Sequence, residues 1–202
     1  MTTNTFWTQT PTFTGNHVTL RPLVPGDRDA LVAAASDGRL WELFYTVVPG
    51  PDTVDAWLAA AFRDQGHGRS MPFAVLDSAG TLIGSTRYLR MNRENRRVEI
   101  GSTFYAARTQ RSPVNTETKL LLLRHAFEAM DCVCVQIRTD FLNRQSQRAI
   151  ERLGAKKDGV IRGHRIMPDG RVRDMVVYSI LAHEWGGVRS NLEMMLSRGD
   201  KR

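Results

Sequence analysis

The sequence predicts a mixed α/β fold whose mostly antiparallel central sheet is flanked by helices. Two strand-like segments, "MPFAVLD" and "LIGSTRYLRMN", surround the short turn "SAG", as in a hairpin. A strand, a helix and a second strand follow one another across residues 97–139, so these two strands should be parallel neighbours. The last strands, "KKDGVIRGHRI" and "RVRDMVVYSIL", surround the turn "MPDG" and should form an antiparallel pair.

The first half of the chain supplies one further strand and two helices. Residues 17–23, "HVTLRPL", alternate as a strand does and end at "PGD". Asp27 is placed to cap the helix "RDALVAAASDG", which Gly38 closes. "PDTVDAWLAAAFRDQG" predicts a second helix, with Gly66 after its end. Gly101, within the strand "RRVEIGSTFY", indicates a bulge or a close backbone approach.

The second half continues this pattern. Helical composition runs from Asn115 to about Met130, and the apolar segment "VCVQIRT" suits a central strand. "NRQSQRAIERLGA" predicts an amphipathic helix with Ile150 and Leu153 on its apolar stripe. "EWGGVRSNLEMMLSRGDKR" predicts a polar tail with one helical turn or more. We therefore divide the chain into an N-terminal extension (1–15), one domain (16–185) and a C-terminal tail (186–202).

The composition is that of an ordinary soluble globular protein, with 42% hydrophobic and 24% charged residues in a chain of 202. No apolar run reaches the roughly 20 residues that span a bilayer, so we expect no membrane association. The N-terminus has neither a charged segment nor an apolar segment typical of export, which makes the cytoplasm the expected location. The net charge, 28 − 21 = +7, favours anionic partners such as a phosphorylated cofactor, a nucleic acid or an acidic surface.

Cys132 and Cys134 are the two cysteines. On a strand they would point to the same face with Cα atoms roughly 6.5–7 Å apart, which is a poor disulfide geometry. We expect two buried, reduced thiols. No cluster of cysteine and histidine supplies further ligands, so no metal site is predicted.

The loop "ARTQRSPVN", residues 107–115, lies between a strand and the N-terminus of a helix. Unpaired backbone amides and the helix dipole make such a place suitable for a phosphate. Arg108 and Arg111 could add charge-assisted contacts, and Pro113 suits a first helical turn. The loop has no glycine, however, and on local evidence it is either a phosphate site or a simple connection.

Six segments together resemble a known family. They are "NHVTLRPL", "LIGSTRY", "VEIGSTFY", "NTETKLLLLRHAFE", "LNRQSQRAIERLGAKKDGVIR" and "DMVVYSILAHEW". In this order they are similar to the GNAT superfamily of acyl-CoA-dependent N-acyltransferases, in the branch of the bacterial ribosomal-protein N-terminal acetyltransferases. The resemblance covers residues 16–185 and implies acetyl-CoA as co-substrate, with no metal.

In that family the loop before the helix binds the pyrophosphate of coenzyme A through its amides. The resemblance implies that Arg111, Ser112, Val114, Asn115 and Thr116 do so here, with help from the Arg108 and Arg111 guanidinium groups. Both usual glycine positions are replaced, by Pro113 and Asn115. The Arg111 side chain is a candidate to compensate.

The resemblance also assigns residues around the thioester. Asn143 should cap the next helix and face the pantetheine arm, with Ser146 one turn on. An amide near Thr103, Phe104 or Tyr105 should polarise the thioester carbonyl where the strands separate. Many relatives carry a tyrosine as general acid seven residues after the asparagine, and that position is Ile150. Either another acid or water must then protonate the thiolate.

Glu99 matches a strand glutamate that some relatives use as general base. A carboxylate with a raised pKa would suit this task. The alternative is that Glu99 pairs with Arg87, Arg97 or another cation and only holds the sheet.

The acceptor residues are less defined. Trp41, Phe44 and Tyr45 could form an acceptor wall or be plain packing. His164, beside Arg162 and Arg165, could line the acceptor pocket or belong to a solvated loop. We expect His125 to be structural and Trp185 to be a packing anchor.

The sequence therefore predicts an N-acetyltransferase that acts on a primary amine by direct attack in a ternary complex. The acceptor is a small molecule or a protein N-terminus. One alternative is a degenerate module of the same fold that binds CoA or a partner. Another, a nucleic-acid-binding protein, is disfavoured because no recognisable motif supports it. The oligomeric state is left open, with a homodimer as one option.

Overall fold

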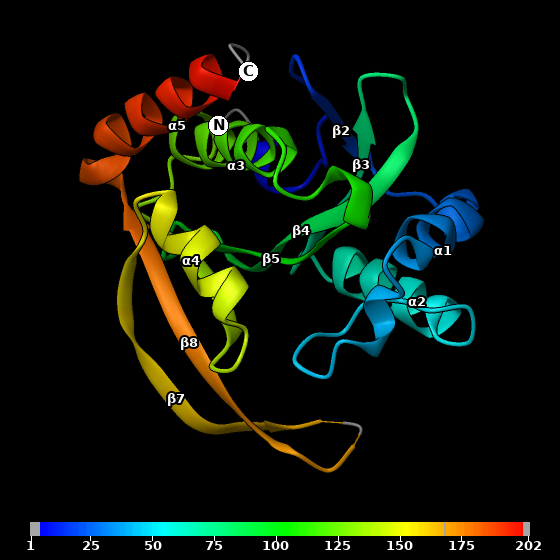
Figure 1. Ribbon diagram of the computed structural model, residues 1–202. Helices are drawn as coiled ribbons and strands as arrows, with labels where there is room; N and C mark the ends of the chain where they lie inside the picture. Colours follow the sequence, from blue (N-terminus) through cyan, green and yellow to red (C-terminus); the bar gives the residue numbers. More distant parts are fainter. Residues whose placement is uncertain (1–4, 168, 200–202) are drawn as a thin grey trace.

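The computed structural model describes residues 5–167 and 169–199, which contain an eight-stranded sheet (Figure 1). The strand order is β1-β2-β3-β4-β5-β6-β8-β7. β5 and β6 pair in parallel and the other neighbours are antiparallel, so the predicted α/β fold and its parallel unit are confirmed. The strands are β1 Phe13–Thr14, β2 Val18–Pro22, β3 Met71–Asp77, β4 Leu82–Asn92, β5 Arg97–Tyr105, β6 Cys134–Asp140, β7 Lys156–Ile166 and β8 Val172–Leu181.

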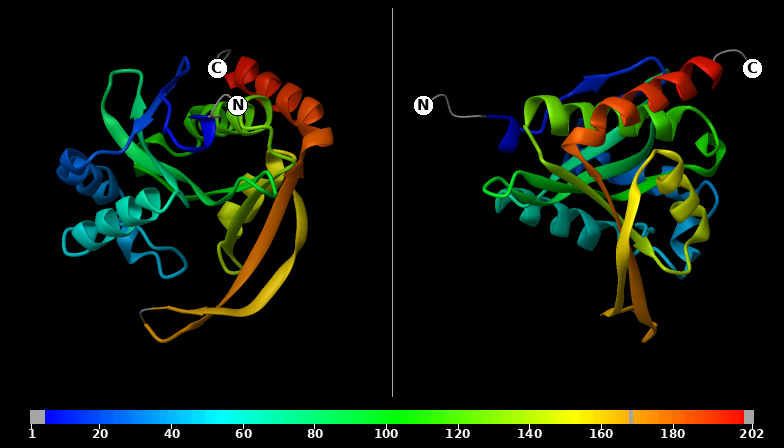
Figure 2. Two further views of the ribbon diagram at one scale, coloured as in Figure 1. Left: turned by 180° about the vertical axis from the view of Figure 1, so that it is seen from behind. Right: turned by 90° about the vertical axis from the view of Figure 1, so that its left-hand side faces the viewer.

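Helices cover the sheet on both sides. Two views at right angles show α3 and α5 on one side, and α1 and α2 on the other (Figures 1 and 2). β7 and β8 extend as a long hairpin that curves toward the segment between α1 and α2. The helices are α1 Arg28–Ser36, α2 Val54–Gly66, α3 Val114–Arg124, α4 Arg144–Arg152 and α5 Trp185–Gly199.

The alternation of side chains along the strands gives the sheet two different faces. The first, which we call the packed face, lies against α3. The Tyr88 hydroxyl of β4 donates a hydrogen bond to the Leu122 carbonyl of α3 at 2.5 Å. Ile100 of β5 and Val135 of β6 are also fully buried on this face. The second, which we call the open face, carries Glu99 of β5, Gln136, Arg138 and Asp140 of β6, and Arg173 of β8.

The packed structure continues at both ends of the domain drawn from the sequence. Trp7, in a turn at Thr5–Trp7, is buried and its Nε1 donates to the Met130 carbonyl at 3.1 Å. Beyond residue 185, α5 packs on α3 and buries Val188 and Leu192. Both segments therefore contribute to the core.

Two local predictions need correction, and a third needs refinement. Asp27 makes no capping bond to α1, because its carboxylate binds Arg21 and the Val24 amide instead. Cys132 precedes β6, which begins at Cys134, so the two thiols do not share a strand face. The helix expected to reach about Met130 does continue that far, but it leaves α-geometry after Arg124 and runs on as a π-helix, His125–Ala129.

The remaining boundaries agree closely with expectation. The β7–β8 turn holds Gly170 at φ +81°, which suits glycine, and Met167 donates its amide to the Arg171 carbonyl at 2.9 Å. Pro168 of the expected turn lies outside the described residues. In the part of the chain that the structure describes, no helix has both the length and the apolar character required to cross a bilayer.

Candidate functional site

An opening forms where β5 and β6 separate. Their parallel pairing runs from Arg97 opposite Cys134 to Ile100 opposite Ile137 and then stops. β5 continues to Tyr105 beside β4, whereas β6 continues to Asp140 beside β8. The β5 residues beyond Ile100 therefore do not pair with β6, as the sequence led us to expect near Thr103.

A β-bulge on β5 shapes one side of this opening. Arg87 pairs with Gly101 and Ser85 with Phe104, so Ser102 and Thr103 together face a single residue of β4. Ser102 adopts a φ of +48°, which is uncommon for a residue with a β-carbon. The bulge inferred from Gly101 is confirmed, and it turns the backbone at the point where the strands part.

The loop before α3 presents backbone donors beside the opening. Pro113 is the N-cap, and the Glu117 amide binds its carbonyl at 2.9 Å, so the Asn115 and Thr116 amides precede the helical hydrogen bonds. The Val114 amide contacts Ser112 Oγ at 3.3 Å. These first-turn donors, with the helix dipole, are features that bind anions.

The two arginines of this loop behave differently. Arg108 forms an ion pair with Asp37 at 3.0 Å and also donates its backbone amide to that carboxylate, so it ties the loop to the end of α1. Arg111 is exposed and sits at φ +61°. Arg111 therefore has the side chain better placed to reach a ligand at the loop.

The N-terminus of α4 lies on the other side of the opening. The Asn143 side chain accepts a hydrogen bond from the Ser146 amide at 2.9 Å, which confirms the predicted cap. Arg152 of α4 reaches across to Thr116 of α3, with 3.1 Å between its Nη2 and Thr116 Oγ1. This bond holds the two helices together close to the opening.

Glu99 is a buried carboxylate on the open face, 5% exposed. Its Oε2 lies 2.8 Å from Arg90 Nη1 and 3.1 Å from Arg138 Nε. Burial raises the pKa of Glu99, and the nearby charges of Arg90, Arg138 and Arg97 only partly oppose this effect. Arg87, one of the partners considered from sequence, instead stacks on Trp57 with its guanidinium carbon 3.9 Å from a ring centroid.

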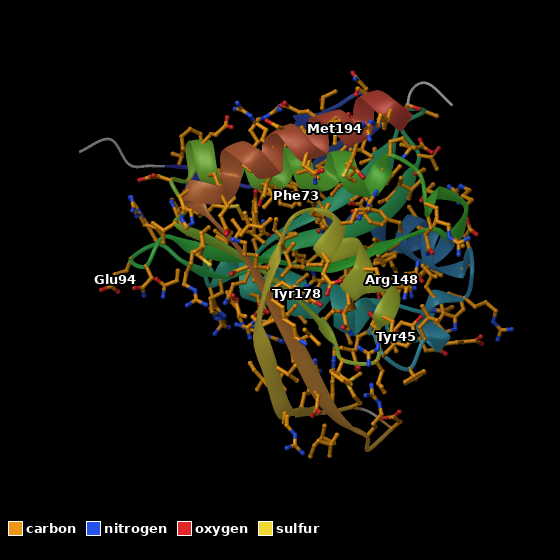
Figure 3. All side chains as sticks on the ribbon, turned by 60° about the vertical axis from the view of Figure 1, so that its left-hand side comes forward. Tyr45, Phe73, Glu94, Arg148, Tyr178 and Met194 are labelled. Atoms are coloured by element: carbon orange, nitrogen blue, oxygen red, sulfur yellow. The ribbon has the colours of Figure 1, made fainter. Side chains whose placement is uncertain are left out.

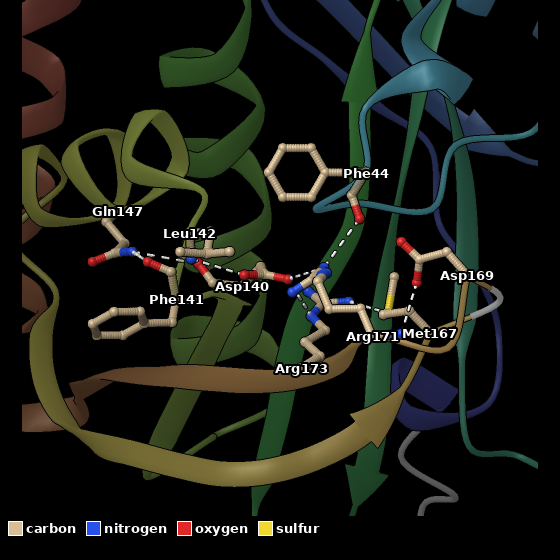
Figure 4. A network of polar contacts seen from close by, with 9 residues as sticks. All are labelled: Phe44, Asp140, Phe141, Leu142, Gln147, Met167, Asp169, Arg171 and Arg173. Atoms are coloured by element: carbon tan, nitrogen blue, oxygen red, sulfur yellow. Dashed lines mark hydrogen bonds and ion pairs between the residues drawn. The ribbon is translucent and has the colours of Figure 1, made fainter.

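A second buried carboxylate, Asp140, organises the end of β6 (Figure 4). Its Oδ2 lies 2.9 Å from Arg171 Nη2 and 3.2 Å from Arg173 Nε. Arg171 also donates to the Phe44 carbonyl at 3.0 Å, which connects the β7–β8 turn to the segment between α1 and α2. Sequence reasoning missed this network, because Asp140 and Arg171 are 31 residues apart.

The expected acceptor residues lie near the tip of the β7–β8 hairpin and on β7. Trp41 and Phe44 line a cavity of about 380 Å³ together with Met167 and Asp169 from the tip of the β7–β8 hairpin. The Tyr45 ring stacks edge-on against Phe44 at 5.1 Å between centroids. His164 of β7 lies near Arg90 and the arginines of β6 and β8; burial first and then these charges lower its pKa.

The packed face holds a charged group that sequence reasoning did not single out. Lys119 of α3 is buried, and its Nζ donates to Thr103 Oγ1 at 3.2 Å. Burial lowers the pKa of Lys119 to about 7. The available signal was a lysine at the start of the apolar run "TKLLLL".

No group of three or more potential metal ligands occurs among residues 5–167 and 169–199. The two described thiols, Cys132 and Cys134, are free. Burial is the main cause that raises the pKa of both thiols.

In the described residues the sheet opens at the parallel β5–β6 pair, with a helix N-terminus on each side, and a solved structure of a putative acetyltransferase shares this fold with TM-score 0.80. The family model for the acetyltransferase (GNAT) domain matches residues 17–156, and the chain belongs to this family. The protein is therefore an acetyltransferase by family and by fold.

Individual relatives agree with this assignment. The putative ribosomal N-acetyltransferase YdaF of Bacillus subtilis (strain 168) is 28% identical over 175 residues, which are 85% of this chain and 94% of YdaF. A putative acetyltransferase from T. thermophilus has a crystal structure with TM-score 0.80 and 36% identity, covering 92% of this chain and 96% of that one. Mycobacterium smegmatis RimJ in complex with CoA-disulfide shares the fold, with TM-score 0.74 and 20% identity over 88% of each chain.

Proposed function

We propose that the protein transfers an acetyl group from acetyl-CoA to a primary amine by direct attack in a ternary complex. The observation that carries the proposal is the opening between β5 and β6, which has the N-termini of α3 and α4 on its sides and the buried Glu99 on its open face. RimJ, which shares the fold, has been observed with CoA-disulfide.

The donor's pyrophosphate would lie at the N-terminus of α3. The amides of Arg111, Ser112, Val114, Asn115 and Thr116 are the donors that we assign to it, and the exposed Arg111 guanidinium adds a cation. Pro113 removes one amide from this set. The Arg111 side chain and the remaining amides would then bind the pyrophosphate, as the amides of the glycine-containing loop do in relatives.

The pantetheine arm would extend along the opening toward the bulge. Asn143 and Ser146, at the start of α4, line the side that faces it in our assignment. On β5, the backbone amides of residues 103–105 lie beyond the last pair with β6 and can polarise the thioester carbonyl.

The acceptor amine would approach from the open face. The neutral amine nitrogen forms a bond to the carbonyl carbon, and Glu99 takes the proton that this nitrogen loses, because its raised pKa makes it a better base than an exposed carboxylate. The carbon–sulfur bond then breaks, and the thiolate of CoA leaves. Ile150 is buried and has no ionisable group that could donate a proton, so water is the acid that we assign to the thiolate.

The acceptor itself would contact the cavity walled by Trp41 and Phe44, with Tyr45 beside Phe44 and with His164 of β7 as a further contact that we assign. Relatives named as ribosomal N-acetyltransferases make a protein N-terminus one candidate class of acceptor. A small-molecule amine is the other.

Two measurements on the full chain test this proposal. Calorimetry with acetyl-CoA should show saturable binding, and a free-thiol assay over a panel of amines should show acetyl-CoA-dependent thiol release. Binding of acetyl-CoA without thiol release on any amine would identify the protein as a CoA-binding module. Absence of acetyl-CoA binding would overturn the donor assignment itself.

A further inference from the structure

The open face carries more arginine than its carboxylates can neutralise. Glu99 is shared by Arg90 and Arg138, and Asp140 is shared by Arg171 and Arg173. Each of these two carboxylates therefore contacts two arginines through one oxygen atom, Oε2 of Glu99 and Oδ2 of Asp140.

A fifth arginine, Arg97, binds a neutral group. Its Nη2 donates to Gln136 Oε1 at 2.6 Å, and Arg138 Nη2 donates to the same oxygen at 3.0 Å. Four guanidinium groups thus share two carboxylates and the fifth contacts an amide, so the arginines outnumber the carboxylates that they contact. Asp158, a further carboxylate whose charge acts on Arg138, is exposed and accepts a hydrogen bond from Ser179.

The excess charge lies in a poorly solvated place. The side chains of Arg138 and Arg173 are only 14% and 12% exposed. Their Nε atoms lie within 3.2 Å of carboxylate oxygens but outside the direction of a hydrogen bond, and no other described residue accepts from them. Buried guanidinium groups that are only partly hydrogen-bonded are costly, and a ligand with anionic oxygens beside them would offset the excess positive charge.

The pKa shifts of neighbouring groups agree with repulsion among the arginines of this face. Burial lowers the pKa of Arg173, and the charges of Arg165 and Arg171 lower it further while Asp140 opposes them. After burial, the pKa of His164 is lowered by four arginines, Arg90, Arg138, Arg173 and Arg165, and no carboxylate opposes them.

We propose that this face binds a carboxylate carried by the acceptor, so that the preferred acceptors are amines with a carboxylate close by, such as peptides whose N-terminal residue is followed by Asp or Glu. The inference rests on the proposed amine acetylation and specifies its substrate. The carboxylate would form ion pairs with Arg138 and Arg173. The same positive field disfavours the ammonium form of the acceptor, which assists loss of its proton.

Initial-rate kinetics on the full chain test this inference. Peptides that differ only at the second residue, Asp against Asn and Glu against Gln, are acetylated with acetyl-CoA. We expect kcat/KM to be about tenfold or more higher for each acid than for its amide, because charge-assisted hydrogen bonds are about twice as strong as neutral ones. Equal kcat/KM values within both pairs would overturn the inference and leave amine acetylation intact.

Variants locate the effect on the open face. Arg138→Gln and Arg173→Gln should each reduce the acid-to-amide ratio toward one. Arg148→Gln, an exposed arginine on α4, is the matched control and should keep the wild-type ratio (Figure 3). Because both peptides are measured on the same preparation, a general loss of activity or folding leaves the ratio unchanged. An undiminished ratio in both open-face variants would overturn the placement.

A third experiment determines whether the carboxylate is carried by the acceptor or by the acyl group. Succinyl-CoA replaces acetyl-CoA with the amide-bearing peptides as acceptors. A higher kcat/KM for succinyl-CoA, with no preference for acidic peptides, would show that the carboxylate enters on the acyl chain and would overturn the acceptor assignment. No thiol release with any peptide, while acetyl-CoA still binds, would instead contradict the proposed function.

Discussion

The two faces of the sheet bury charged side chains in different ways. On the packed face, Lys119 is buried with a single hydroxyl partner, Thr103 Oγ1, and no carboxylate contacts it in the part of the chain that the structure describes. On the open face, Glu99 and Asp140 are each held between two arginines. Burial favours the neutral form of both Lys119 and Glu99, but the arginines around Glu99 oppose this effect, whereas burial alone acts on Lys119.

The largest expected effect concerns Lys119. Its pKa of about 7 in the folded chain lies below its value in the unfolded chain, about 10.4. The unfolded state therefore binds this proton more tightly, so the free energy of unfolding decreases as pH falls from about 10 to 7, and the loss is complete below 7. Lys119→Leu should raise the free energy of unfolding at pH 6 by roughly 2–4 kcal/mol.

Urea unfolding at pH 6 and pH 9 checks this prediction. The gain from Lys119→Leu should be larger at pH 6 than at pH 9. Lys157→Leu, at an exposed position of β7, is the control and should not reproduce the pH-dependent gain. A loss of stability in Lys119→Leu at both pH values would show that Lys119 is adequately solvated or paired.

The second effect concerns the role of Glu99. If it is the general base, Glu99→Gln should lower kcat by about tenfold or more at neutral pH. In the wild type, activity should rise with pH through the raised pKa of Glu99, because the base must be deprotonated. The variant should lose this rise.

A pH–rate series from pH 6 to 9 makes the measurement. Glu94→Gln, in the exposed turn after β4, is the matched control (Figure 3). Unchanged activity of Glu99→Gln over the whole range would leave Glu99 as a structural partner of Arg90 and Arg138. The open face would then resemble the packed face in using its charge only for packing.

The smallest effect concerns the donor loop. Arg111→Ala should raise KM for acetyl-CoA about threefold and leave kcat unchanged, as expected for a solvated ion pair worth up to about 1 kcal/mol. Alanine keeps a β-carbon at the positive φ, so the backbone strain is preserved. Arg63→Ala, exposed on α2, is the control. An unaltered KM would assign Arg111 to the surface.

Local sequence patterns predicted much of the fold because they act over short distances. The β-bulge beside Gly101, the Asn143 cap and the parallel β5–β6 pair all depend on residues close in sequence or on one short crossover. The Asp27 cap was wrong because Arg21 and the Val24 amide compete for the same carboxylate. The general preference of aspartate for the start of a helix carries no information about such competition.

The ion pairs of the site could not be predicted in the same way. Strand alternation places Glu99 on a defined face, but its partners come from β4 and β6 and depend on side-chain reach. Arg108 meets Asp37 across 71 residues. The pairing of Asp140 with Arg171 depends on how far the β7–β8 hairpin curves, and no local signal encodes that curvature.

The network around Asp140 gives the two sides of the site a physical connection. It begins at the Phe44 carbonyl, passes through Arg171 to Asp140, and continues because Asp140 Oδ1 accepts from the Leu142 amide at 2.7 Å, directly before α4. Gln147 of α4 donates to the Phe141 carbonyl at 2.6 Å. An acceptor that moves Phe44 would therefore act on the helix where we place the donor. By thermodynamic linkage, if the acceptor changes the affinity for the donor by some factor, the donor changes the affinity for the acceptor by the same factor. The coupling is therefore the same whichever substrate binds first.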